Sequence, residues 1–318
     1  MAATRIRVTV IDLILHQYDF SNYAEKVRLA LGYKNLTWHA VEIPPVAPKP
    51  DLIPLTGGYR RTPVLQIGAD IYCDTRLILR VIEQLAPEPS LFPENTIGLA
   101  NATSHWAETQ LFRPISLYVS GTNADVLPAN LQADRSAMRG LPPPDATTME
   151  RAAKRSAPLV RVGLTRVADI LADGRNWILG DTVTIADFSV YHALWFITGR
   201  TTRLAHELEP FDGIAAWMTR MQAFGHGHVK PMSSIEALNI AAASEPVPPA
   251  ASAPFPEDPD LGATVRIRAD DYGRDAIEGQ LVYLDAEEIA ILRSDPRVGE
   301  VCVHFPRLGY DLRTTEAR

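Results

Sequence analysis

The chain has 318 residues, 46% of them hydrophobic, which is enough to bury a full core and to form two domains with a small third. Its formal net charge of −7 gives no electrostatic case for nucleic acid or an anionic membrane, and no run approaches the roughly 18 apolar residues of a membrane span. The N-terminal segment carries the acidic Asp12 within its apolar part and has no small-residue cleavage signature. We therefore expect a cytoplasmic protein whose partner is a small molecule.

Cysteine and histidine usage predicts no metal site. The two cysteines, Cys73 and Cys302, are far apart in the sequence, which argues against a disulfide framework and against a cysteine-rich metal site. Cys73 is expected to be a small buried residue and not a nucleophile. His226 and His228 stand close together, but no third ligand is apparent, so we expect a solvated loop there.

Residues 6–88 are predicted to form a small α/β domain. The apolar run 8–15 indicates a strand covered on both faces, and apolar residues at helical spacing follow from about Ser21. A second strand is expected at 36–43, which gives a βαβ unit with a right-handed crossover. A proline-rich loop at 44–54, where a regular helix is disfavoured, leads to the rest of the domain.

The segment 59–85 predicts a hairpin followed by an amphipathic helix. Pro63 stands directly before the apolar run 64–67, where a strand entry or a cis peptide bond is expected because proline cannot donate to a ladder. Asp74 and Thr75 fall at the start of the helix, whose free N–H groups favour anions. The segment therefore predicts a peptide-binding strand edge beside an anion-binding helix start.

Residues 94–240 are predicted to form an all-helical domain. The helix at 185–197 is apolar on most sides, as expected at the centre of a bundle, and Thr184 and Asp187 stand at capping-box spacing at its start. The stretch 121–148 contains three consecutive prolines and is predicted to loop between helices, with no chemistry assigned to it.

A linker and a small β module are predicted after the helical region. Residues 241–261 are rich in proline and alanine, a composition that stays extended and does not pack. Residues 262–318 alternate apolar and polar side chains at strand spacing. Because so short a module is near the lower limit for independent folding, we expect it to dock on the helical domain or on a partner subunit. Its 8 Arg and 11 Asp plus Glu give 8 − 11 = −3, which disfavours nucleic acid.

Residues 6–240 resemble the glutathione S-transferase superfamily, which joins a thioredoxin-like α/β domain to an all-helical domain. The segment FSNYAEKVRLAL (20–31) is similar to the first helix of the family, and TPVL (62–65) is similar to its cis-proline turn. CDTRLILRVIE, at 73–83, looks like its acid-hydroxyl helix start, and TIAD (184–187) resembles the capping box of its core helix. The appended β module departs from the usual two-domain pattern.

The resemblance implies a glutathione site. Ser21 matches the position that contacts the glutathione sulfur in serine-type and cysteine-type members, where a hydroxyl and a helix N-terminus would stabilise the thiolate. Val64, after Pro63, would pair with the cysteinyl backbone of glutathione, while Asp74 and Thr75 would take the γ-glutamyl ammonium and carboxylate. The nearest cations for the glycine carboxylate are Arg60 and Arg61. The electrophile is expected against second-domain side chains, and the candidates for its pocket are Tyr18, Tyr23, Trp106, Phe112 and Tyr118.

Alternatives stay open at the sulfur position. Ser21 is also a plausible helix cap, with Asn22 and Glu25 offering a rival capping pair. Tyr18 and Tyr23 are phenols near the same strand end, and some family members use tyrosine at this place. The sequence does not decide between these hydroxyls.

The leading functional hypothesis is a glutathione transferase, a homodimer like most of the family, that conjugates the thiolate to a small hydrophobic electrophile. A related alternative is glutathione-dependent reductive or ether-cleaving chemistry. A thiol-disulfide oxidoreductase is disfavoured because serine cannot form a mixed disulfide. The remaining alternative is a non-catalytic binding protein whose β module recruits a partner.

Overall fold

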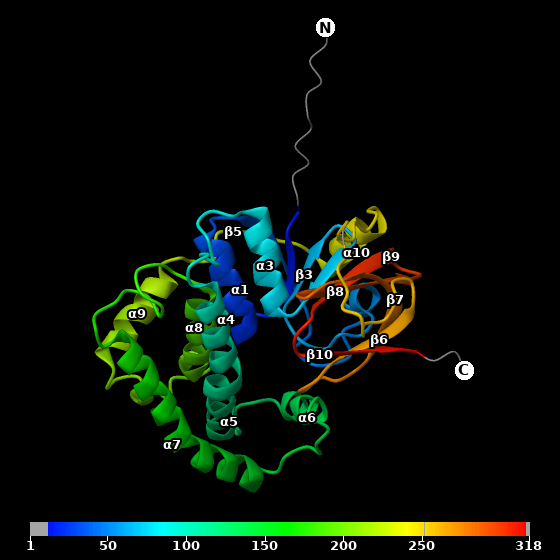
Figure 1. Cartoon of the computed structure of the whole chain (residues 1–318). Helices are drawn as coiled ribbons and strands as arrows, with labels where there is room; N and C mark the ends of the chain where they lie inside the picture. Colours follow the sequence, from blue (N-terminus) through cyan, green and yellow to red (C-terminus); the bar gives the residue numbers. More distant parts are fainter. Residues whose placement is uncertain (1–11, 251, 316–318) are drawn as a thin grey trace.

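One mixed sheet runs through both the N-terminal and the C-terminal parts of the chain (Figure 1). The structure is a computed structural model that describes residues 12–250 and 252–315. The ten strands lie in the order β10-β6-β7-β8-β9-β4-β3-β1-β2-β5. They are β1 (Ile14–Gln17), β2 (Thr37–Glu42), β3 (Val64–Ile67), β4 (Asp70–Cys73), β5 (His228–Pro231), β6 (Thr264–Ala269), β7 (Ile277–Leu284), β8 (Glu288–Asp295), β9 (Gly299–Pro306) and β10 (Tyr310–Thr314).

The N-terminal unit has the predicted β-α-β, loop, β-β-α order. Strand β1 pairs in parallel with β2 and antiparallel with β3, and β3 pairs with β4. The helices are α1 (Asn22–Tyr33), α2 (Ile53–Thr56) and α3 (Thr75–Leu85). Strand β1 begins at Ile14; residues 8–11 of the strand predicted at 8–15 lie outside the described residues, and residues 12 and 13 are not in a strand. Side chains alternate between two cores along β3, with Leu65 facing α1 and α3 and Val64 facing the opposite side.

The helical region covers one side of the molecule (Figure 1). Its elements are α4 (Ile97–Trp106), a π-helical turn (Ala107–Leu111), α5 (Phe112–Thr122), α6 (Ala129–Ala137), α7 (Ala146–Leu171), α8 (Ile185–Thr198), a short 3-10 turn (Ala205–Glu207) and α9 (Asp212–Gln222). Helix α8 is buried along nearly its whole length and begins with the predicted capping box of Thr184 and Asp187. The stretch 121–148 contains the helix α6, which the sequence did not predict. No helix among the described residues is long and apolar enough to cross a membrane.

The C-terminal module is fused to the N-terminal sheet. Strand β9 pairs in parallel with β4, so that Asp70 lies opposite Cys302 and Tyr72 opposite His304. The sequence predicted docking on the helical domain or a partner subunit; the main attachment is instead to the N-terminal sheet, and the helical region adds a backbone hydrogen bond from the Gly273 N–H to the Met138 carbonyl at 2.6 Å. Docking on β4 covers an edge whose backbone groups would otherwise be unpaired.

The residues that join the helical region to the module pack on the sheet as well. Strand β5 pairs in parallel with β2, and α10 (Ser234–Ala242) packs into the core shared with the module. Both histidines are exposed, as expected; His226 lies in the turn before β5 and pairs with Glu25 at 3.1 Å, whereas His228 is the first residue of β5 and not part of a loop. The linker is extended, but it makes hydrogen bonds to the sheet: the Val247 N–H donates to both Asp70 carboxylate oxygens at 3.1 Å. The prediction that the linker does not pack is therefore wrong.

A buried ionic bridge holds the β4–β9 joint. The imidazole of His304 bonds to Glu288 through Nδ1 at 2.6 Å and to Asp70 through Nε2 at 3.3 Å, and it stacks on Tyr72. Burial alone would lower the pKa of His304, but its hydrogen bonds to Asp70, Cys302 and Glu288 raise that pKa well above the usual value. Asp70, Cys302 and His304 hold ligand atoms within 4.8 Å of one another. Because both ring nitrogens already bond to carboxylates, we assign this cluster to the joint and not to a metal.

His304→Gln is expected to destabilise the protein by about 3 kcal/mol, since it leaves two buried carboxylates without their cation. The pKa of His304 is raised on folding, so the stabilisation is fully present below about pH 6.5 and declines as the pH rises through the folded-state pKa. Urea unfolding of wild type and variant across this range measures the difference. A difference that grew with pH would contradict the charged bridge.

Candidate functional site

The turn before β3 places Thr62, and not Val64, at the surface of the site. The Thr62–Pro63 peptide bond is cis, in agreement with the resemblance to the cis-proline turn. Val64 is fully buried and lies between His16 on β1 and Cys73 on β4, so the sheet occupies both of its sides. Thr62 lines both cavities described below, and its hydroxyl accepts a hydrogen bond from Lys49 Nζ at 2.8 Å.

The start of α3 has the geometry of an anion-binding helix N-terminus. Asp74 adopts φ 75°, a left-handed conformation that aspartate tolerates better than most residues, and its carboxylate accepts from the Arg76 N–H at 3.0 Å. Thr75 is the first residue of α3, and its hydroxyl accepts from Lys26 Nζ at 3.4 Å. Lys26 is buried and forms an ion pair with Glu108 in the π-helical turn. Sequence reasoning missed Lys26 and Glu108, because their ion pair joins residues 82 apart in the chain and has no local signature.

A cavity of about 480 Å³ lies beside Asp74 and Thr75, and we call it the α3 cavity. Its lining also includes Thr62, Pro63 and Arg61. Part of the wall comes from the C-terminal module, through the residues Asp270, Asp271, Tyr272, Leu308 and Gly309. The sequence assigned no role to this module. Its main structural contribution to the site is therefore to close one side of the α3 cavity.

Arg61 is held by the module. Its guanidinium forms an ion pair with Asp271, donates through Nε to the Tyr272 carbonyl at 3.1 Å and lies 4.4 Å from the centroid of the Tyr272 ring. It also lies 3.9 Å from Asp74, whose carboxylate accepts from the Tyr310 hydroxyl at 3.3 Å. Module residues thus orient two of the side chains that the sequence proposed for glutathione.

A second cavity, of about 290 Å³, lies beside Ser21 at the start of α1, and we call it the α1 cavity. Ser21 is the N-cap of α1: its Oγ accepts from the Ala24 N–H at 3.2 Å. The rival cap is excluded, because the Asn22 side chain bonds to His192 at 2.8 Å and Glu25 bonds to Arg28 at 2.9 Å. Capping uses a lone pair of the Ser21 oxygen and leaves its O–H free to donate.

The five predicted pocket residues fall into two groups. Tyr18, Tyr23 and Phe112 line the α1 cavity, and Tyr23 lines the α3 cavity too. Trp106 lies in a separate groove beside α7, and Tyr118 donates to Glu207 at 2.8 Å, so the structure brings neither to the two cavities. Tyr18 accepts from Arg135 at 2.9 Å. Burial raises the pKa of Tyr23 well above its usual value, so its phenol stays protonated.

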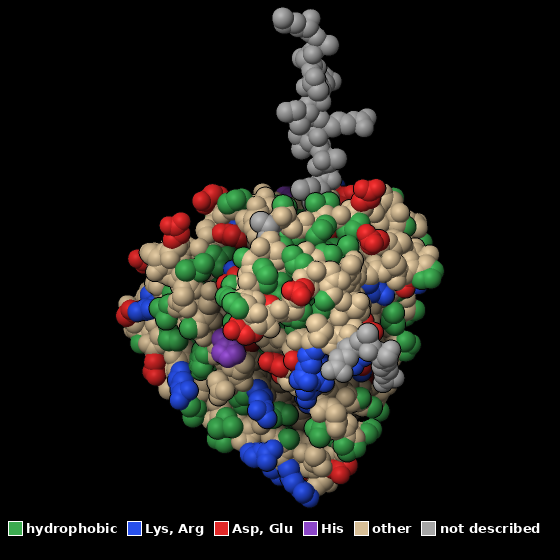
Figure 2. Space-filling model, turned by 45° about the vertical axis from the view of Figure 1, so that its right-hand side comes forward, with side chains coloured by type: hydrophobic (Ala, Val, Ile, Leu, Met, Phe, Trp, Pro, Cys, Tyr) green, Lys and Arg blue, Asp and Glu red, His purple; other side chains and the backbone are tan. Residues whose placement is uncertain are grey.

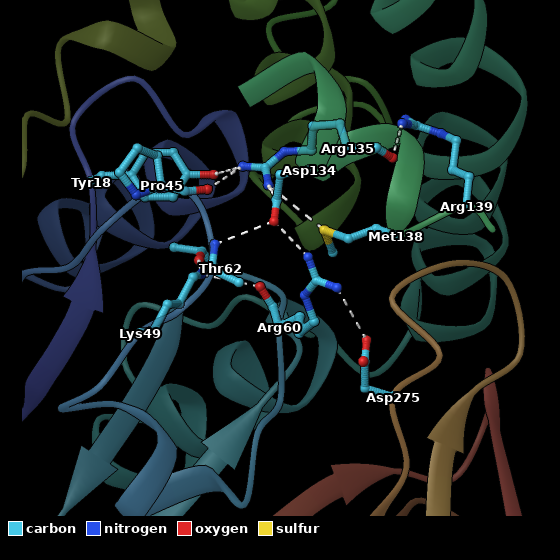
Figure 3. A network of polar contacts seen from close by, with 11 residues as sticks. Tyr18, Pro45, Lys49, Arg60, Thr62, Asp134, Arg135, Met138, Arg139 and Asp275 are labelled. Atoms are coloured by element: carbon cyan, nitrogen blue, oxygen red, sulfur yellow. Dashed lines mark hydrogen bonds and ion pairs between the residues drawn. The ribbon is translucent and has the colours of Figure 1, made fainter. Parts of the chain in front are cut away.

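Charged side chains from α6 and the loops before β3 form a network at the α1 cavity (Figure 3). Asp134 lies between Arg60 and Arg135, with distances of 2.5 and 2.6 Å to their guanidinium nitrogens. Lys49 lies beside this network and donates to the Thr62 hydroxyl. Burial lowers the pKa of Lys49 to about 7. The sequence assigned no chemistry to 121–148, but α6 and the residues after it supply this wall.

The comparisons with known proteins identify the class. The glutathione S-transferase N-terminal domain matches residues 15–90, and the C-terminal domain of the same family matches residues 152–220. A solved structure of a GST-like protein from Pseudomonas syringae is 36% identical, with a TM-score of 0.78 over 96% of this chain and 99% of that chain. No curated protein sequence matches the chain. The chain belongs to the glutathione S-transferase superfamily, and the predicted fold class is confirmed.

Two further solved structures share the fold at lower identity. A glutathione S-transferase from Methylobacterium radiotolerans, in complex with glutathione sulfonate, is 19% identical with a TM-score of 0.51, over 70% of this chain and 97% of that chain. The β-etherase LigF from Sphingobium is 16% identical with a TM-score of 0.51, over 67% and 96%. The match to the Pseudomonas syringae protein leaves 100 − 96 = 4% of this chain uncovered, so it includes most of the β module.

Proposed function

We propose that the protein binds glutathione across the two cavities and adds its thiolate to an electrophile in the α1 cavity. The observation that carries the proposal is the convergence of three groups: the Asp74–Thr75 helix start, the cis turn at Thr62 and the Ser21 cap. The α3 and α1 cavities share Thr62 and Tyr23 in their linings, so a tripeptide can extend from one into the other.

Each unit of glutathione has a matching partner in this arrangement. The γ-glutamyl ammonium pairs with the Asp74 carboxylate, and its carboxylate meets the Thr75 hydroxyl and the N-terminus of α3. The cysteinyl unit binds the backbone of Thr62, which replaces Val64 in our assignment because Val64 lies inside the sheet. The sulfur then points toward Ser21.

The chemistry requires stabilisation of the thiolate. A free thiol has a pKa near 8.5, so it is mostly protonated at neutral pH. The Ser21 O–H donates to the sulfur while its oxygen still accepts the hydrogen bond from the Ala24 N–H. The positive end of the α1 dipole stabilises the thiolate further. The thiolate attacks the electrophilic carbon, a carbon–sulfur bond forms, and the leaving group departs with its electron pair or the carbanion takes a proton from water.

The same thiolate can cleave an aryl ether, and the lining of the α1 cavity by Phe20, Phe112 and Phe196 favours an aromatic substrate for either reaction. The β-etherase LigF shares the fold. Displacement of a phenolate from the substrate carbon by sulfur is therefore the second candidate function. The homodimer stays a prediction.

The wild-type protein is expected to bind glutathione in isothermal titration calorimetry and to conjugate it to 1-chloro-2,4-dinitrobenzene. Cysteinylglycine, which lacks the γ-glutamyl unit, is expected to bind about 100-fold more weakly, because it loses two charge-assisted contacts. Binding without turnover of any electrophile would favour a non-catalytic role. Equal binding of the dipeptide and glutathione, or no binding of either, would overturn the proposed site.

A further inference from the structure

The α1 cavity carries more positive charge than its surroundings balance. Its lining contains five arginines, at positions 60, 61, 135, 139 and 200, and no aspartate, glutamate or lysine. Carboxylates pair with three of them: Asp134 contacts Arg60 and Arg135, Asp275 also contacts Arg60, and Asp271 and Asp74 contact Arg61. Basic side chains also gather on the lower half of the face in Figure 2.

Arg139 and Arg200 have no carboxylate partner among residues 12–250 and 252–315. Among the described residues Arg139 donates only to the Arg135 carbonyl, at 2.8 Å (Figure 3). Arg200 makes no hydrogen bond within the described part of the chain, and its Nε is buried without a partner. Burial lowers the pKa of Arg200, as does the nearby charge of Arg135. A partly buried cation without a counterion is costly unless a ligand supplies one.

Arg200 stands at the aromatic end of the cavity, next to the proposed position of the sulfur. Its guanidinium lies 4.6 Å from the centroid of Phe20 and 5.3 Å from that of Phe196, and Phe20 directly precedes Ser21. An aromatic surface beside a free guanidinium fits a ligand that has an aromatic body and an anionic group. Such a ligand would place its ring against the phenylalanines and its anion against Arg200.

We propose that the electrophile is an aromatic carboxylate or a similar organic anion, and that Arg200 binds its anionic group in the α1 cavity. This inference rests on the proposed function and narrows its substrate class from the small hydrophobic electrophile expected from the sequence. The glycine carboxylate of glutathione is a second anionic group that an arginine of this cavity can bind. Because Arg60 stands two residues before Thr62 in the chain, we assign that carboxylate to Arg60 and not to Arg200.

The test compares ethacrynic acid, an aryl enone with a remote carboxylate, with its primary amide. In both, the thiolate forms a bond to the terminal enone carbon, the double-bond electrons pass to an enolate, and the enolate takes a proton from water. The wild type is expected to favour the acid about 10-fold in kcat/KM, because only the acid makes a charge-assisted contact with Arg200. In Arg200→Gln this ratio is expected to fall to about 1, and in Arg200→Lys to be partly retained.

Arg151→Gln is the matched control, since Arg151 is exposed on α7 and forms no ion pair within the described residues; it is expected to keep the wild-type ratio. Calorimetry with the saturated, unreactive analogues of both compounds measures the same ratio without turnover. If these analogues show the preference while no conjugation occurs, the proposed function fails and the anion site stands. Equal binding of acid and amide by the wild type would overturn the inference. So would an Arg200→Gln variant that loses affinity for glutathione while its acid-to-amide ratio is intact, which would assign Arg200 to the glycine carboxylate.

Discussion

Replacing Ser21 with alanine is expected to lower the rate of conjugation about 30-fold near pH 7. The variant loses the hydroxyl that donates to the sulfur, and we expect the pKa of bound glutathione to rise by about two units, back toward that of a free thiol. The rate deficit should therefore shrink as the pH rises above about 8.5, where the thiolate forms without help. The pH profile of kcat and the ultraviolet absorbance of the bound thiolate measure this shift.

The control for Ser21→Ala is Ser233→Ala. Ser233 caps α10 as Ser21 caps α1, with its Oγ accepting from the Glu236 N–H at 3.2 Å, and it lines neither cavity. Both variants are expected to lose about 1 kcal/mol of stability, but only Ser21→Ala should shift the thiol pKa. If Ser21→Ala were fully active and Tyr23→Phe inactive, the sulfur would belong to the phenol of Tyr23.

Replacing Asp74 with asparagine is expected to weaken glutathione binding by about 10- to 100-fold, because the γ-glutamyl ammonium loses an ionic partner. Asparagine tolerates the left-handed backbone at this position and keeps an oxygen that can accept from the Arg76 N–H, so the helix start should survive. The loss is expected mainly in KM. Calorimetry with glutathione and with its analogue lacking the γ-glutamyl amine isolates the contact.

Removal of the amine should weaken binding to the wild type much more than binding to Asp74→Asn. Asp145→Asn is the control, because Asp145 caps α7 with its carboxylate 2.6 Å from the Thr148 N–H and lies outside both cavities. It should bind glutathione and the analogue as the wild type does. Equal losses in wild type and Asp74→Asn on removal of the amine would place the ammonium elsewhere, for example beside Asp270 or Asp271.

The parts of the site that the sequence could predict are those fixed within a few residues of chain. Three features carry such a local signature: a serine at a helix start, a proline before a strand, and an acid-hydroxyl pair before an amphipathic helix. All three have the expected backbone conformation. The shift from Val64 to Thr62 shows where this reasoning ends. The choice between the two residues depends on which of them is paired with strands on both sides. Strand pairing is not a local property, so the sequence does not reveal it.

The module and the arginine wall could not be predicted for the same reason. Nothing in residues 299–306 indicates that they pair with β4, because alternation marks a strand but does not name its neighbour. Asp134 and Arg135 lie in a stretch whose prolines suggested a loop, and their network depends on the contact of Asp134 with Arg60. Arg200 lies outside every motif; Phe196 is only four residues before it, but the fold alone brings it to Phe20.

The fusion of β9 to β4 also determines which piece of this chain can be studied by itself. A fragment ending near residue 240 would correspond to the two family domains, yet it would open the β4 edge and uncover Ile71 and Val64, which are now fully buried. It would also remove the module residues that line the α3 cavity and hold Arg61. The smallest unit that keeps this sheet intact therefore extends through β10, and a conventional two-domain truncation would be prone to edge-to-edge association.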